Sequence, residues 1–233
     1  MQSDIRTLVQ DVRREPEGRA LEHGLDGAVL DRVARWGVAV VRGALSQQQC
    51  GDLLAEADRT GQRFLDLPRR VNGVHQHAEQ LAARVDDPSR PALGRLVATL
   101  RQALASQAPW TGLRHFVPTE ARYMRYSGRS SGLGVHRDGK CYALIVCVFS
   151  LAGTAPFSVL SDDDDEPSLD VLVHAGDLVL LRAPGLAGGR DGRPRHAVGA
   201  PLAGSRVSLT LRMVKVHPRA APAPPWSGEG VSR

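Results

Sequence analysis

The spacing of apolar residues changes near Pro118, from a helical period to a strand period. Before that point, apolar residues follow Pro91 at intervals of three and four, which predicts a helix that starts at Ser89 with Pro91 in its first turn. Ser46 and Gln49 form a capping box, which predicts another helix. The short apolar run 37–41 favours a buried strand. These elements indicate a scaffold rather than a site.

Weaker patterns complete the first half of the chain. The segment 1–35 has irregularly spaced leucines and valines, so we expect helix and loop there. The segment 62–76 has no clear period and is expected to be a loop, followed by a helix over 78–85. For His75 and His77, a solvated surface position is the simpler interpretation and contact with a substrate is the alternative.

After Pro118 the chain alternates short apolar strands with turns rich in Gly, Pro and Asp, which is typical of a β-barrel or β-sandwich. We expect one domain over 1–217, in which 1–117 provides helical support and substrate-side elements and 118–217 is the β-helix core, followed by a flexible tail over 218–233. The strands are expected at 121–126, 142–151, 157–160, 169–173, 178–181, 197–200 and 206–216, and the main turns at 128–134, 162–167, 175–177 and 184–194.

Two histidines and one aspartate form the first candidate site. His136 and Asp138 are two residues apart, so on an extended segment both side chains point to the same side. Taken alone, this pair is equally consistent with a surface His beside a turn Asp. His196 lies several predicted strands later, and two imidazoles with one carboxylate leave open positions on an iron ion. A structural zinc site is a poorer alternative, because zinc more often takes three or four N or S ligands in a closed site.

The last predicted strand has a wholly polar face. Its residues alternate between a polar and an apolar set, Arg206, Ser208, Thr210 and Arg212 against Val207, Leu209 and Leu211. A half-exposed strand with its polar face in water has the same pattern. Inside a barrel, however, the guanidinium of Arg206 would match a carboxylate with two hydrogen bonds, and Ser208 would add another. The strand therefore also predicts a dicarboxylate site.

Together these motifs resemble the Fe(II)/2-oxoglutarate oxygenase superfamily, over about residues 121–216. The shared pattern is H-x-D, a distal His, and then Arg with Ser or a similar residue two positions on. The resemblance implies an α+β, mainly β, fold: a double-stranded β-helix, or jelly-roll and cupin-like core, backed by N-terminal helices. It also implies Fe(II), 2-oxoglutarate and O2, with the metal on His136, Asp138 and His196 and the co-substrate on Arg206 and Ser208.

Two further motifs resemble the alkylation-repair, AlkB-like branch of that superfamily. The run from Arg206 to Arg212 is similar to its R-x-N-x-T-x-R signature, and Tyr126 stands where the branch has a tyrosine that contacts 2-oxoglutarate. By this resemblance Tyr126 and Arg212 also help to bind the co-substrate. Ser208 and Met124 replace two asparagines of the branch, which weakens the inference of repair more than that of the metal chemistry.

Composition bears on the substrate. The net charge is +5, but the arginines are scattered and aromatic residues make up only 4%, so a groove that stacks bases is not indicated. The acidic segment 162–166 is expected to be a solvated turn or, if it borders the site, to suit a cationic amino sugar.

The Ala-, Arg-, Gly- and Pro-rich composition resembles that of high-GC bacteria, where many such enzymes tailor natural products. We therefore expect a small-molecule substrate and a tailoring step, hydroxylation or oxidative ring closure, as in the biosynthesis of an aminoglycoside-type antibiotic. Oxidative demethylation of alkylated nucleic acid is the first alternative. A catalytically silent barrel that serves as a binding module is the second.

The remaining features concern location. The longest apolar run, 143–148, is far shorter than the ~20 residues of a membrane-spanning helix. The N-terminus lacks the layout of a secretion signal, and three cysteines are an odd, sparse set. We expect a cytoplasmic protein with no membrane partner. The sequence leaves the oligomeric state and the oxidised carbon open.

Overall fold

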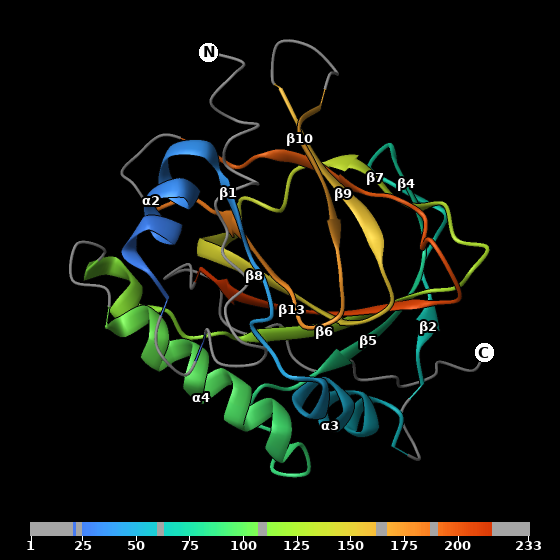
Figure 1. Cartoon of the computed structure of the whole chain (residues 1–233), viewed down its shortest axis with the longest axis horizontal. Coiled ribbons are helices and arrows are strands. Elements are labelled where there is room, and N and C mark those ends of the chain that lie inside the picture. The colour runs from blue at the N-terminus through green and yellow to red at the C-terminus, as the bar shows by residue number, and fades with distance from the viewer. Residues whose placement is uncertain are drawn as a thin grey trace, which may run out of the picture.

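The computed structural model describes residues 21, 25–59, 63–106, 111–161, 167–186 and 191–215. Their strands form two antiparallel sheets that face each other (Figure 1). The larger sheet consists, in order, of β1 (Val38–Val41), β11 (Leu178–Arg182), β8 (Tyr142–Ala152), β13 (Arg206–Val214), β6 (Glu120–Tyr126), β5 (Glu79–Ala83) and β2 (Leu65–Asp66). The smaller sheet consists of β10 (Pro167–Val173), β9 (Ala155–Leu160), β12 (Arg195–Val198), β7 (Gly132–His136), β4 (Val74–His77) and β3 (Arg70–Val71).

Helices cover the outer face of the larger sheet (Figure 1). They are α2 (Gly27–Trp36), α3 (Gln47–Ala57) and α4 (Pro91–Ala105), with a 3-10 helix at Thr111–His115. Buried helical leucines such as Leu30, Leu53 and Leu100 pack in one cluster with Phe149 and Leu209 of the sheet. Each buried leucine contributes roughly 2 kcal/mol of transfer free energy, so this layer supports the sheet from behind.

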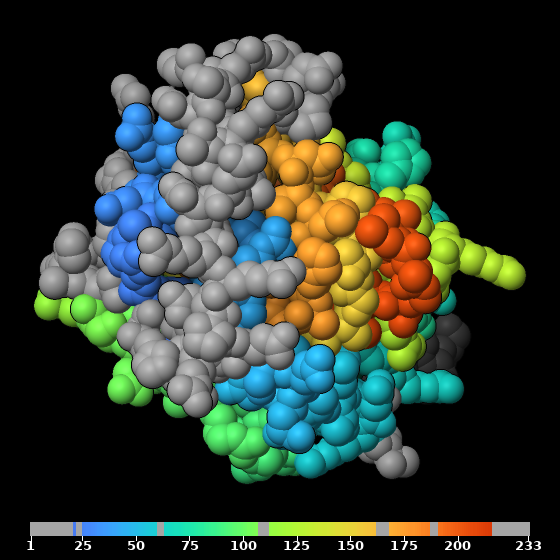
Figure 2. All heavy atoms as spheres, in the orientation of Figure 1, coloured from blue at the N-terminus to red at the C-terminus, as the bar shows by residue number. Residues whose placement is uncertain are grey.

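A second, smaller apolar cluster lies between the two sheets. Val146 and Val179 of the larger sheet pack with Phe157, Val159 and Val198 of the smaller one. Most of this cluster comes from β1, β11, β8, β9 and β10, so it fills one half of the space between the sheets. The outer face of the smaller sheet is visible in Figure 2, where β10, β9 and β12 lie side by side in orange, yellow and red.

The predicted fold class, mainly β with a double-stranded β-helix core and N-terminal helices, is confirmed. The strands expected after Pro118 are all present with small shifts of their ends. The capping box is present as well, with Ser46 Oγ accepting from Gln49 N at 3.2 Å and Gln49 Oε1 from Ser46 N at 2.8 Å. Helix α4 begins at Pro91, two residues after the expected start at Ser89, and the buried carboxylate of Glu56 accepts from the backbone N–H groups of Ala92 and Leu93.

The segment before the β core was predicted wrongly in two places. The expected helix over 78–85 is strand β5, because its backbone pairs with β6 and buries Leu81. The expected loop over 62–76 contains β2, β3 and most of β4, three short strands that extend the edges of both sheets. Local pattern missed these strands because two or four residues carry little periodicity, and pairing with the sheets decides their conformation.

A third correction concerns the turn expected over 128–134. Residues from Gly132 onward belong to strand β7, which pairs with β12. Gly132 has φ +85°, and a Cβ there would collide with the carbonyl oxygen of Val198, so only glycine allows this close approach. The predicted tail over 218–233, the acidic segment 162–166 and most of 1–24 fall outside the described residues. Within the described residues, every helix is too short or too polar to cross a membrane.

Candidate metal and co-substrate site

His136 and His196 lie side by side because β7 and β12 pair with these two residues in register. Their ring centroids are 4.3 Å apart. Asp138 comes two residues after the end of β7, and its Oδ2 lies 3.8 Å from Nε2 of His196. The fold thus brings together the three side chains that the sequence pattern singled out.

A backbone carbonyl orients each imidazole. Nδ1 of His136 lies 2.9 Å from the carbonyl oxygen of Gly134, and Nδ1 of His196 lies 3.2 Å from that of Pro194. Because a carbonyl oxygen only accepts, Nδ1 carries the proton in both rings and Nε2 keeps a lone pair. Histidines held in this way are typical metal ligands.

Burial favours the neutral form of His196. Its side chain is 6% exposed. Burial, and then the neighbouring His136, lower the pKa of His196 to about 4, while the charge of Asp138 opposes the shift. Phe157 also stacks on the ring, with centroids 5.7 Å apart. At neutral pH this imidazole is therefore in the form that a metal ion requires.

The three side chains stand slightly further apart than ligands of one ion. Among the described residues, no group of three or more His, Cys, Asp or Glu side chains is gathered tightly enough to hold a metal ion as it stands. Two ligands at about 2.1 Å from one ion and at a right angle would lie roughly 3 Å apart, against 3.8 Å between Asp138 and His196. The difference is about 1 Å, and two imidazoles with one carboxylate are a donor set whose chemistry fits one iron ion.

A buried arginine without an acidic partner faces the same pocket. Arg206, at the start of β13, is 1% exposed, and no carboxylate in the described part of the chain pairs with it. Its Nη2 donates to Ser150 Oγ at 3.1 Å and its Nη1 to Ser208 Oγ at 3.4 Å, while Nε has no partner. Burial lowers the pKa of Arg206, yet a guanidinium remains charged in proteins. Such a group is suited to an anionic ligand, because an unpaired buried charge is costly.

Tyr126 borders the same guanidinium. It pairs with Arg206 in the β6–β13 register, and the guanidinium carbon lies 5.4 Å from the ring centroid. Burial raises the pKa of Tyr126, against the opposing charges of Arg206 and Arg212. The hydroxyl therefore stays protonated at neutral pH and can donate to an anion. Tyr126, Ser208 and Arg206 thus lie together, as expected for residues of one binding site.

Arg212 has different surroundings, although it lies on the same face of β13. Its Nη1 donates to Glu120 Oε1 at 2.9 Å and to the Tyr142 hydroxyl at 3.3 Å, and its Nη2 lies 3.2 Å from Asp138 Oδ1. Its guanidinium carbon lies 4.7 Å from the Tyr142 ring centroid. Arg212 therefore directly contacts Asp138 of the histidine–aspartate group, which consists of His136, Asp138 and His196.

One pocket of about 460 Å³ between the sheets is lined by the three candidate metal ligands and by Tyr126, Tyr142, Arg206, Ser208 and Arg212. It occupies the half that the apolar cluster leaves open. The larger sheet contributes the polar face of β13, and the smaller sheet contributes His136, His196 and Leu133. The segment 67–76, which runs from the end of β2 into β4, forms a further wall with Leu67, Pro68, Val71, Asn72, Val74 and Gln76.

Sequence reasoning missed several residues of this site. Ser150 is a fully buried serine within the apolar strand β8, and that mismatch was the available signal. No signal in the sequence pointed to Glu120 or Tyr142, because their roles depend on contacts with Arg212 across three strands. His75, by contrast, is exposed, which agrees with the simpler interpretation of that residue.

Comparison with solved structures places this fold in a known group. A Burkholderia pseudomallei oxidoreductase of the 2OG-Fe(II) oxygenase family is 12% identical, with a TM-score of 0.56 over 86% of this chain and 92% of that one. A Pseudomonas putida prolyl-4-hydroxylase is 16% identical, with a TM-score of 0.57 over 82% and 98%. OsALKBH1 is 19% identical, with a TM-score of 0.52 over 76% and 98%. No family model and no curated protein sequence matches the chain.

The fold is therefore the double-stranded β-helix of the Fe(II)/2-oxoglutarate oxygenases. At these identities the likeness shows the fold alone. What the site does has to be argued from its own residues.

Proposed function

We propose that this protein is an Fe(II)- and 2-oxoglutarate-dependent oxygenase that oxidises a C–H bond of a small molecule, in a natural-product tailoring step. One observation carries the proposal. A buried guanidinium without an acidic partner faces the same pocket as two metal-competent imidazoles and one carboxylate. A metal ion and a dicarboxylate co-substrate that bind side by side require both of these sites in one pocket.

The roles follow from the contacts. His136 and His196 would bind the iron through Nε2, and Asp138 through its carboxylate, which leaves open positions for other ligands. Arg206 would bind the far carboxylate of 2-oxoglutarate, with Ser208 and Tyr126 as further donors. When bound, iron and 2-oxoglutarate would supply oxygen activation coupled to decarboxylation. Arg212 would hold the Asp138 carboxylate, and contact with the co-substrate remains a prediction for it.

The pocket also constrains the substrate. Its volume of about 460 Å³ is that of a small-molecule site. Four arginines line it, Arg122, Arg137, Arg206 and Arg212, against the acid Asp138, and Glu120 pairs with Arg122 and Arg212. A bound Fe(II) and a 2-oxoglutarate dianion would cancel each other, so the excess of positive charge would remain. A neutral or anionic substrate is thus favoured over the cationic amino sugar expected from the sequence.

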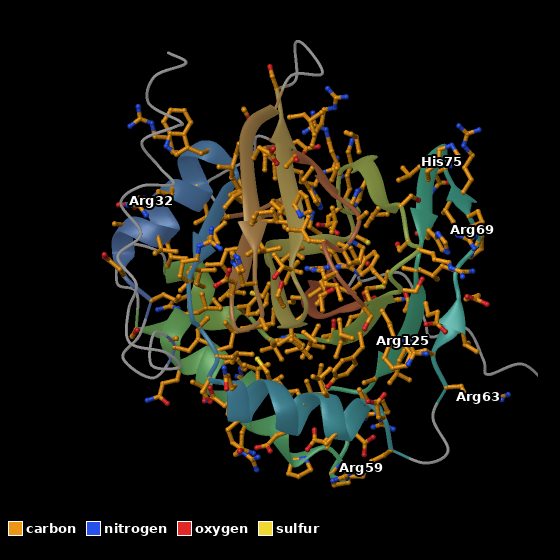
Figure 3. The ribbon with its side chains drawn as sticks, turned by 45° about the vertical axis from the view of Figure 1, so that its right-hand side comes forward. Arg32, Arg59, Arg63, Arg69, His75 and Arg125 are labelled. Atoms are coloured by element: carbon orange, nitrogen blue, oxygen red, sulfur yellow. The ribbon has the colours of Figure 1, made fainter. Side chains whose placement is uncertain are left out.

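A second candidate is oxidation of alkylated nucleic acid. Residues 63–70, next to the pocket wall in the sequence, include Arg63, Arg69 and Arg70 against Asp66, and all four side chains are exposed. Figure 3 shows Arg63, Arg69 and His75 pointing outward on this side of the molecule. A basic surface beside a pocket favours a polyanion. The likeness to OsALKBH1 agrees with this candidate without deciding it.

The direct test is succinate formation by purified protein with Fe(II), 2-oxoglutarate and a substrate panel. The panel would pair neutral, anionic and cationic small molecules of similar size with methylated oligonucleotides. Succinate should form with the wild type and fall to background in Asp138→Ala and Arg206→Met. A protein that binds neither iron nor 2-oxoglutarate would instead be a silent binding module, and the proposal would be wrong.

Salt dependence separates the two candidates. Binding to an oligonucleotide should weaken steeply with ionic strength, and Arg69→Gln with Arg70→Gln should reduce the slope of log Kd against log salt. A small-molecule oxygenase should show weak oligonucleotide binding that these substitutions leave unchanged.

A further inference from the structure

Of the three residues proposed as metal ligands, Asp138 is the one whose backbone lies outside the strands. His136 and His196 lie within strands and pair with each other, and His196 also pairs with Val159 of β9. Asp138 stands beyond the last residue of β7, in a stretch without regular structure. Arg212 of β13 contacts the Asp138 carboxylate, and contacts other than the strand ladder must therefore fix the backbone of Asp138 relative to His196.

Two arginines join the segment of Asp138 to the segment of His196. The side chain of Arg193 donates from Nη1 to the backbone carbonyl of Asp138, and the side chain of Arg137 donates from Nη1 to the backbone carbonyl of Arg193. The two contacts run in opposite directions between the same two segments. We call this pair the arginine clasp.

Arg193 is held rigidly for this contact. Its side chain is 9% exposed, and Asp191 accepts from its Nε at 2.8 Å and from its Nη2 at 2.7 Å. This bidentate pairing lowers the pKa of Asp191, so the carboxylate is ionised across the physiological range. A planar guanidinium held on two nitrogens leaves Nη1 directed to the Asp138 carbonyl, a geometry that a lysine does not reproduce.

The loop around Arg193 is itself anchored. A Cβ on Gly192 would lie only 2.5 Å from Arg182 Nη1, so the chain passes tightly against that guanidinium. Arg182 in turn donates from Nη1 to the Ala34 carbonyl at 2.7 Å, at the end of α2. One residue after Arg193, the Pro194 carbonyl orients His196. The same short loop therefore positions both His196 and Asp138.

From these contacts we infer that Arg193 is a positioning residue that sets the affinity of the histidine–aspartate site for its metal ion. The inference rests on the proposed function, since it presumes that the site binds metal. It goes beyond that function because Arg193 does not line the pocket and touches neither imidazole. Loss of an outer partner of this kind typically weakens metal binding by about 10- to 100-fold.

The test is metal binding by Arg193→Met, measured by anaerobic titration with Fe(II) and, in parallel, with Co(II), whose visible spectrum reports coordination. Arg195→Met is the matched control, because Arg195 comes from the same segment and donates to a distant carbonyl, that of Ser161, at 2.9 Å. We expect Arg193→Met to bind metal at least about 10-fold more weakly, with an altered Co(II) spectrum, and Arg195→Met to match the wild type.

A general loss of stability would shift the thermal midpoint without changing the Co(II) spectrum of the folded protein. If Arg193→Met does not fold, Arg193→Lys decides, since it keeps the charge and loses the bidentate geometry. An Arg193 variant that binds metal within about twofold of the wild type, with the same spectrum, overturns the inference. A wild type that binds no metal overturns the proposed function itself, and the two failures are therefore distinguishable.

Discussion

The two ends of the polar face of β13 have opposite charge environments. Arg212 is surrounded by the protein's own acids, Glu120 and Asp138, and by Tyr142. Arg206, six residues earlier on the same face, has only hydroxyl partners and an aromatic ring. Arg212 is thus ion-paired with acidic side chains, whereas Arg206 has no acidic partner among the described residues. The difference indicates that Arg206 is the arginine available to bind an external anion.

The largest expected effect follows from replacing Arg206, the arginine without an acidic partner among the described residues. Arg206→Met should weaken 2-oxoglutarate binding by ~10³-fold, because losing one partner of a buried charge pair typically costs about 2–5 kcal/mol. Calorimetric titration into the Mn(II)-loaded protein measures this. The free energy of unfolding of the ligand-free protein should not fall, since a buried charge without an acid is removed. A variant that loses stability but keeps its 2-oxoglutarate affinity would refute the assignment.

Removing the paired end should produce the converse result. Arg212→Met leaves Glu120 and Asp138 without their partner, and we expect a loss of about 2–3 kcal/mol in the free energy of unfolding, somewhat less than for a fully buried pair. Chemical denaturation at neutral pH measures it, with Arg195→Met as the control. If Arg206→Met and Arg212→Met lower stability equally, the contrast between the two ends is wrong.

Acid should weaken the site through His196. Its folded-state pKa of about 4 lies below the ordinary value of 6.5. The unfolded chain therefore binds a proton first, and the free energy of unfolding should fall as the pH drops from about 6.5 to about 4. Denaturation of the metal-free protein at several pH values tests this. In His196→Gln the decline should be shallower over that window, and an unchanged decline would exclude His196 as its source.

The smallest effect concerns the hydroxyl partners of Arg206. Ser150→Ala and Ser208→Ala each remove one neutral partner, worth about 1 kcal/mol or less than tenfold in 2-oxoglutarate affinity. Because Ser208 lines the pocket and is proposed to donate to 2-oxoglutarate, while Ser150 contacts only Arg206 at 3.1 Å, Ser208→Ala should have the larger effect. The reverse order in the titration would show that Ser208 does not donate to the ligand.

How far the sequence predicted the molecule depends on the range of the interactions involved. The alternation of β13 was readable because strand periodicity is local, and its apolar face does pack under the helices. The strands β2 to β5 could not be predicted in this way. They are stabilised by pairing at the sheet edges and not by a pattern in their own sequence. For the same reason His136 and Asp138 stood out as a motif, while Glu120, Ser150 and Arg193 did not. Each of those acts on a residue far away in the sequence.

The most direct test of the central claim is the stoichiometry of Fe(II) bound under anaerobic conditions, by wild type and by variants of the histidine–aspartate group. The account predicts about one ion per chain in the wild type, and none retained after gel filtration by His136→Ala, Asp138→Ala or His196→Ala. Arg195→Met should retain the ion. A folded wild type that binds no iron would contradict this prediction. So would variants of His136, Asp138 or His196 that retain the ion.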